Sequence, residues 1–219
     1  MRYYLALLTV ATLFIAPFPT PRSHIAAGSG PPRATVLGYS REEFGQGWAD
    51  TGNGCTTRTE ALALAFGGDG VASISCSTPY TSWGAAPIDD PYTGTAITPA
   101  DVELDHLIPL SAAWDLGAHA WPRRTRIAFA NDPRNLVVVS AAANQEKSDQ
   151  LPSEWMPPAR RKRCAYSHRL ADVAQAYHLV LPAEDLRAMR RSCAGFSGLI
   201  GTRSLNGSQV HAQTAGREL

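Results

Sequence analysis

The sequence predicts an α+β protein centred on two strands that are followed directly by a helix. Three stretches carry this prediction. "ELDHLIPL" at 103–110 has the composition of a buried strand with polar residues in its middle, and "NLVVVS" at 135–140 is rich in β-branched residues. "AAANQEKSD" at 141–149 consists mostly of good helix formers. A chain of 219 residues with 44% hydrophobic content suits one domain with tails.

The N-terminal segment 1–27 predicts a secretory signal peptide. Arg2 precedes an apolar run at 3–16, prolines at 17, 19 and 21 interrupt it, and small residues stand before Gly28. The run is too short for a comfortable membrane span, and no later stretch is longer and as apolar. We therefore expect a secreted, extracellular protein that makes no membrane contact after the signal is cleaved.

The remaining boundaries follow from composition. Residues 28–37 are rich in Gly, Pro and Ser and predict a flexible leader. Residues 199–219 are polar without periodicity and predict a disordered tail. The folded domain is therefore expected to span 38–198.

Four cysteines in an exported chain indicate two disulfides, for which three connectivities exist. We favour Cys55–Cys76 and Cys164–Cys193, because each bond would close a modest loop within one half of the chain. A zinc–thiolate site would need close pairs such as C-x-x-C, and the sequence contains none.

Further elements are expected around this centre. Thr57 and Glu60 form a capping-box pattern at the start of a short helix that ends at Gly67. Residues 71–98 alternate β-forming residues with Gly and Pro and predict short strands and turns. A basic helix is expected at 160–179, and a last helix between Pro182 and about Cys193.

The net charge of +1 hides an uneven distribution. Residues 38–119 contain two arginines, Arg41 and Arg58, against eleven acidic residues. Residues 120–170 contain ten basic residues against four acidic ones. This distribution suits an anionic polymer that binds beside a cluster of carboxylates, although opposite charges that pair across a solvated surface would give the same composition.

The polar residues of the predicted strand–strand–helix unit suit a single site. If the strands form a hairpin with the helix packed across it, Asp105, His106, Asn135 and Asn144 converge. Asp105 and Asn144 offer hard oxygen ligands for Mg²⁺ or Mn²⁺. A neutral imidazole at His106 can accept a proton from water near neutral pH. This chemistry is metal-assisted phosphodiester hydrolysis, and it needs no organic cofactor.

Adjacent residues of a regular strand point to opposite faces, which constrains Asp105 and His106. Either the strand bends or ends near Pro109, or the metal and the attacking water lie on different sides of the scissile phosphate. An in-line attack places the nucleophile opposite the leaving group, so the second arrangement is chemically natural.

Three stretches, "DVELDHLIPLSAAWDLGAHAW", "FANDPRNLVVVSAAANQEKSDQLPSEWMPP" and "GNGCTTRTEAL", resemble the HNH endonucleases of the GmrSD C-terminal type, in a branch of small secreted bacterial proteins. The resemblance covers about residues 38–195. It implies a ββα-metal (His-Me finger) HNH core in which Asp105 is a metal ligand and His106 is the general base. It further implies that Asn135 holds the loop that bears the base and that Asn144 is the second metal ligand. Asn at this last position favours Mg²⁺, with Mn²⁺ as the alternative.

Four basic residues are candidates for substrate binding. The resemblance suggests that Lys147 approaches a phosphate, although a surface pair with Asp149 fits the spacing equally well. Arg58 suits either a phosphate contact or a structural ion pair. Arg160 and Arg161 could follow a nucleic-acid backbone, but the basic surface of a helix would look the same.

These observations predict a monomeric, secreted, metal-dependent endonuclease that cleaves DNA with low sequence selectivity. The resemblance implies products with 5′-phosphate and 3′-hydroxyl ends. Two alternatives stay open: a catalytically silent module that binds nucleic acid or an envelope polymer, and a hydrolase of another phosphodiester such as RNA.

Overall fold

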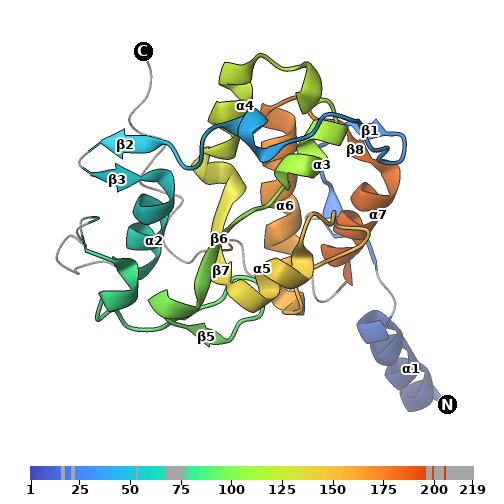
Figure 1. Ribbon diagram of the computed structural model, residues 1–219. Coiled ribbons are helices and arrows are strands. Elements are labelled where there is room, and N and C mark those ends of the chain that lie inside the picture. The colour runs from blue at the N-terminus through green and yellow to red at the C-terminus, as the bar shows by residue number, and fades with distance from the viewer. Residues whose placement is uncertain are drawn as a thin grey trace, which may run out of the picture.

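The computed structural model describes residues 1–15, 18–20, 23–52, 54–67, 76, 78–195, 199 and 205. It confirms the α+β class: helices surround a central pair of strands (Figure 1). The helices are α1 (Arg2–Ile15), α2 (Thr57–Gly67), α3 (Leu110–Asp115), α4 (Arg123–Ala130), α5 (Ala141–Lys147), α6 (Arg160–Ala176) and α7 (Ala183–Ser192). The strands are β1 (Ser29–Gly30), β2 (Asp50–Gly52), β3 (Cys55–Thr56), β4 (Ile88–Asp89), β5 (Ala96–Ile97), β6 (Val102–His106), β7 (Leu136–Ser140) and β8 (Leu181–Pro182).

The predicted strand–strand–helix unit consists of β6, β7 and α5. β6 and β7 are antiparallel, with Val102 opposite Ser140 and His106 opposite Leu136. Ser140 ends β7 and is also the N-cap of α5, because its hydroxyl accepts a hydrogen bond from the amide of Ala143 at 3.3 Å. The helix therefore leaves the strand without a connecting loop, and this fixes its position over β6.

Both faces of the β6–β7 pair are covered. Leu104, Leu136 and Val138 pack into the apolar cluster of α2, which also holds Leu62 and Phe66. On the opposite face, Val137 and Val139 belong to the larger core that α6 and α7 complete. β-branched residues therefore continue along β7 without alternation, as expected for a strand that is buried on both sides.

Two disulfides have the expected connectivity. Cys55 is bonded to Cys76 beside α2, and Cys164 of α6 is bonded to Cys193 just after α7. Both predicted pairs are confirmed. His168 lies close to the second pair, but the two sulfurs are bonded to each other and so are not thiolate ligands.

The capping box of α2 is displaced by one residue from the prediction. The Thr56 amide donates to the Thr59 hydroxyl at 2.8 Å, and the Thr59 amide donates to the Thr56 hydroxyl at 3.3 Å. Thr56 is thus the capping residue, while Thr57 is already in the first turn. The prediction of Thr57 and Glu60 was wrong because Thr59, with a shorter side chain, closes the same reciprocal pair.

The N-terminal region is described in part. α1 projects from the body of the molecule (Figure 1), and within the described residues no helix is long and apolar enough to cross a membrane. Ile25 is buried in the core, and β1, from the segment predicted as a leader, pairs in parallel with β8. Arg33 of the same segment forms an ion pair with Asp115 at 2.7 Å.

Two predicted segments lie partly outside the described residues. Residues 71–75 and 77 lie outside them, whereas β4 and β5 form an antiparallel pair within the predicted 71–98 region. All of the predicted tail 199–219 except residues 199 and 205 also lies outside them.

Candidate active site

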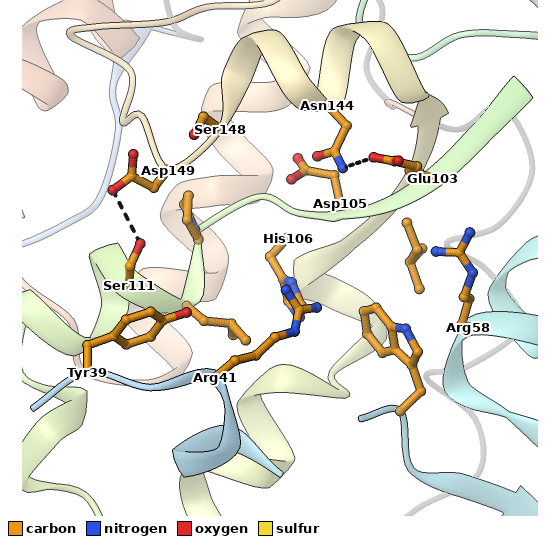
Figure 2. Close-up of a pocket in the computed structure, with 14 residues that line it drawn as sticks. Tyr39, Arg41, Arg58, Glu103, Asp105, His106, Ser111, Asn144, Ser148 and Asp149 are labelled. Carbon is orange, nitrogen blue, oxygen red and sulfur yellow. Dashed lines mark hydrogen bonds between the residues drawn. The ribbon is translucent and has the colours of Figure 1, made fainter. Parts of the chain in front are cut away.

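A cavity of about 410 Å³ opens at the end of β6 where α5 crosses the sheet (Figure 2). Its lining comes from the segment before α2, from α2 itself, from β6 and the start of α3, and from α5 and the residues after it. The lining residues are Tyr39, Arg41, Trp48, Arg58, Glu103, Leu104, Asp105, His106, Pro109, Leu110, Ser111, Asn144, Ser148 and Asp149.

His106 is held in one orientation at the end of β6. Its ring stacks on Trp48, with the centroids 5.3 Å apart and the planes 14° apart. Nε2 lies 2.8 Å from the carbonyl oxygen of Ala130. Because a carbonyl can only accept, Nε2 carries the proton of the neutral ring, and Nδ1 keeps a lone pair.

Burial, reinforced by the positive charges of Arg41 and Lys147, lowers the pKa of His106 to about 4. The hydrogen bond to Ala130 opposes this change only in part. The ring is therefore neutral at pH 7. Nδ1 has no hydrogen bond to any described residue, and a neutral imidazole with such a nitrogen beside a cavity has the arrangement of a general base.

Asp105 lies on the other face of β6 from His106, as the strand alternation requires (Figure 2). Its carboxylate accepts a hydrogen bond from the Tyr92 hydroxyl at 2.5 Å and pairs with Lys147 Nζ at 3.0 Å. Burial raises the pKa of Asp105, and the attraction of Lys147 opposes that effect. Both side chains still line the one cavity, because His106 is the last residue of the strand.

Lys147 is fully buried behind Asp105. Its ammonium donates to Asp105 Oδ1 at 3.1 Å and to the carbonyl of His106 at 2.8 Å. It is not among the lining residues of the cavity, and its ion pair is with Asp105 and not with Asp149. Lys147 belongs to the last turn of α5, and its side chain points into the protein. Its ammonium therefore lies beside the buried carboxylate of Asp105, which needs a cationic partner.

Asn135 is fully buried and joins the start of β7 to the residues that follow β6. Its Oδ1 accepts from the Ile108 amide at 2.9 Å, and its Nδ2 donates to the Ile108 carbonyl at 3.2 Å. Its own carbonyl accepts from the Leu107 amide at 2.8 Å. The loop just after His106 is therefore held by three hydrogen bonds to one residue.

Asn144 of α5 reaches across to β6. Its Nδ2 donates to Glu103 Oε2 at 2.6 Å. Glu103 precedes Asp105 by two residues in β6, so the two side chains lie on the same face of the strand. A carboxylate can only accept, so the amide must present its NH₂ group to Glu103 and its Oδ1 elsewhere. Figure 2 shows Asn144 and Asp105 side by side above the strand.

The donor set of this cavity suits a hard divalent cation. Asp105, Asn144 and Glu103 provide carboxylate and amide oxygens, the ligands that Mg²⁺ and Mn²⁺ prefer. Among the lining residues, His106 is the one imidazole, and no thiol is present. Asp105 and Asn144 are the residues that would hold such an ion.

The predicted basic residues fall in two places. Arg58 lines the cavity, where its guanidinium lies 5.5 Å from the centre of the Tyr80 ring. Arg160 and Arg161 are exposed at the start of α6 and are not among the lining residues. The structure thus brings Arg58 together with His106 and leaves the other two outside the cavity.

Sequence reasoning missed several residues of the site. Trp48, which stacks on His106, and Tyr92, which binds Asp105, stand in stretches without a local motif. Arg41 also lines the cavity, on the other side of His106 from Arg58 (Figure 2). A signal for it was available, because Arg41 and Arg58 are the two basic residues in the acidic segment 38–119.

Comparisons with known proteins identify the family of the chain. The family model of the C-terminal domain of the GmrSD restriction endonucleases matches residues 76–178, which include β6, β7 and α5. An uncharacterized secreted protein of Arthroderma benhamiae is 34% identical over 204 residues, which cover 86% of this chain and 97% of that protein. The comparison with solved structures gives no match. The chain belongs to the family defined by the C-terminal domain of the GmrSD restriction endonucleases.

Proposed function

We propose that this protein is a secreted, metal-dependent endonuclease that hydrolyses phosphodiester bonds in DNA with low sequence selectivity. The observation that carries the proposal is the geometry of His106. Its Nε2 is committed to the Ala130 carbonyl, so Nδ1 is the basic nitrogen at the cavity. The family match supports a nuclease activity of this general type.

His106 removes a proton from the attacking water through Nδ1. Asp105 and Asn144 would hold the divalent cation, Mg²⁺ or Mn²⁺, since both offer oxygen ligands at the cavity. A bound cation supplies charge stabilisation at the phosphate and at the leaving oxygen. Because base and ligands lie on different faces of the strand end, attacking water and leaving group can stand on opposite sides of the phosphorus.

Two residues position this machinery. Asn135 fixes the backbone after His106 through its bonds to Ile108. Glu103 orients the amide of Asn144 so that the oxygen is free for the cation. Arg58 binds a neighbouring phosphate, and Arg160 and Arg161 extend the contact along the backbone. Contacts of this kind add affinity and salt dependence without sequence preference.

Secretion is supported by three features. The predicted signal segment precedes the domain, each half of the domain contains one disulfide, and the similar protein of Arthroderma benhamiae carries the word "secreted" in its name. The branch of bacterial proteins and the monomeric state stay predictions.

Plasmid cleavage by the oxidised protein tests the proposal. We expect nicking with Mg²⁺ or Mn²⁺, none with EDTA, and a loss of about 10²- to 10⁴-fold in His106→Ala at unchanged folding. Matched assays with RNA define the substrate class. Binding of DNA without cleavage of DNA or RNA by the wild-type protein in any metal would show a silent binding module instead.

A further inference from the structure

Two hydrogen-bond donors at the edge of the cavity have no role in the scheme above. Figure 2 shows Arg41 and the hydroxyl end of Tyr39 directed into the cavity, on the side of His106 away from Arg58. Both come from the short segment 39–41 that precedes α2 by some fifteen residues. They are therefore placed beside the base and not beside the proposed cation ligands.

Neither donor has a hydrogen-bond partner among the described residues. In the described part of the chain, the Arg41 guanidinium and the Tyr39 hydroxyl have no hydrogen bond, and Arg41 has no ion pair. Other arginines of the molecule behave differently: Arg33 pairs with Asp115 at 2.7 Å and Arg126 with Glu43 at 2.6 Å. Arg41 thus keeps its full donor capacity for a ligand.

The segment that carries these donors is fixed to the core. The Tyr39 ring lies 6.3 Å from the rings of Phe44 and Trp114, and Phe44 is almost completely buried against Phe129. Glu43, two residues after Arg41, is tied to Arg126. Because this backbone is already ordered, a ligand of Arg41 need not order it on binding.

The charges around the cavity select the ligand. Asp149 on the same rim is paired with Arg33 at 3.0 Å, and Glu103 is engaged by Asn144. Arg41 and His106 line the same part of the cavity (Figure 2). An anion that reaches His106 therefore meets Arg41 on one side and Arg58 on the other (Figure 2).

We propose that Arg41 and Tyr39 form a phosphate-binding subsite that holds a non-bridging oxygen of the scissile phosphodiester next to His106. This inference rests on the proposed nuclease function and identifies two residues of the site that bind substrate. The planar guanidinium donates to two phosphate oxygens, and the phenol adds a third donor. Both residues are substrate-binding groups, and the base stays His106.

The test measures binding separately from cleavage. A fluorescent DNA oligonucleotide is titrated in EDTA and followed by anisotropy, and kcat and KM are measured with Mg²⁺. The variants are Arg41→Ala, Arg41→Lys and Tyr39→Phe. The control is Arg123→Ala, which removes one exposed positive charge on α4 outside the cavity.

We expect Arg41→Ala to raise Kd in EDTA about ten- to a hundredfold and to reduce the slope of log Kd against log salt by about 1. Arg41→Lys should recover the salt slope but only part of the affinity, because an ammonium cannot bind two oxygens in the fork geometry. Tyr39→Phe should show a smaller loss with the salt slope unchanged. Arg123→Ala should bind and cleave as the wild type does.

The outcomes separate this inference from the proposed function. Wild-type cleavage with unaltered binding and KM in Arg41→Ala overturns the subsite and leaves the nuclease intact. Arg41-dependent binding in a wild-type protein that cleaves nothing supports the subsite while the nuclease proposal fails. Absence of binding by the wild type, with and without Mg²⁺, overturns both.

Discussion

The protonation state of His106 is decided by its immediate surroundings. Trp48 covers one face of the ring, and the Ala130 carbonyl fixes the proton on Nε2. Burial makes the charged imidazolium unfavourable, so the folded pKa of about 4 lies well below the ordinary value. The same residue therefore links activity and stability to pH.

In the unfolded chain His106 takes up its proton near its ordinary pKa of about 6.5, whereas in the folded protein it does so near 4. Between these values the unfolded state binds more protons, so folding stability from this residue is complete above pH 6.5 and is lost as the pH falls towards 4. We expect a loss of about 3 kcal/mol in the free energy of unfolding.

Urea unfolding at pH 7 and pH 4.5 measures this effect. In His106→Gln the decrease between the two pH values should be smaller than in the wild type by about 2–3 kcal/mol. Because His106 keeps its basic, neutral form down to about pH 4, the kcat/KM of the wild type should fall on the acidic side only near that pH. Equal pH dependence of stability in both proteins would contradict the assigned pKa.

The pair of Asp105 and Lys147 is a second local determinant. Lys147 has no exposed side-chain surface and Asp105 has 7%, so each charge depends on the other. Lys147→Met should cost about 3–5 kcal/mol because it leaves a carboxylate buried without a cation. Asp105→Asn in the same chain should restore part of that stability. A double-mutant cycle by urea unfolding measures the coupling, and strictly additive costs would contradict the pairing.

At the scale of elements, Ser140 joins the strand pair to the helix. Its hydroxyl donates to Asp90 Oδ2 at 2.6 Å and accepts from the Ala143 amide at 3.3 Å. Asp90 in turn accepts from the Tyr92 amide and from the Thr93 hydroxyl in the turn after β4. The start of α5 is thus tied to the neighbouring turn, and Asn144 follows one turn later.

We expect Ser140→Ala to destabilise the protein by about 1–3 kcal/mol, since it removes a helix cap and leaves a buried carboxylate with one donor fewer. The affinity for Mn²⁺, measured by electron paramagnetic resonance, should also fall as the first turn of α5 loosens. Ser153→Ala, an exposed position, serves as the control and should stay within about 0.5 kcal/mol of the wild type. Equal stability of the two variants would show that Ser140 does not stabilise the junction between β7 and α5.

For the whole molecule, the second disulfide secures the larger core. Cys164 and Cys193 are both buried and join α6 to the end of α7, whose inner faces pack behind β7. The cavity lined by His106 and Asn144 has neither cysteine in its lining. Stability and catalysis should therefore respond differently to the loss of this bond.

Replacing both residues, Cys164→Ala with Cys193→Ala, should lower the free energy of unfolding by about 3 kcal/mol, because the unfolded chain gains the freedom of the opened loop. Specific activity at 25 °C should remain within a factor of about two, as measured on the folded fraction. A large loss of activity without loss of stability would show that the bond shapes the cavity.

The sequence by itself determined the local parts of this protein. The β-branched run of β7, the helix formers of α5 and the order of Asp105, His106, Asn135 and Asn144 are properties of neighbouring residues, and the strand–strand–helix unit follows from them. The even cysteine count and the short spacing within each half gave the disulfide pairs. Neighbouring residues also misled one prediction. Thr56 and Thr57 are both suitable capping residues for α2, and the structure uses Thr56.

Only the tertiary structure decided what surrounds those residues. Arg41 and Trp48 reach the site from the segment before α2, and Tyr92 reaches it from the turn after β4, so no spacing relative to Asp105 and His106 predicts them. The polar residues around Lys147 in the sequence are typical of an exposed lysine. Its side chain is nevertheless buried, because the buried carboxylate of Asp105 needs a cationic partner. The physical reason is that burial and electrostatic pairing are sums over all neighbours in space, whereas propensity and spacing depend on neighbours in sequence.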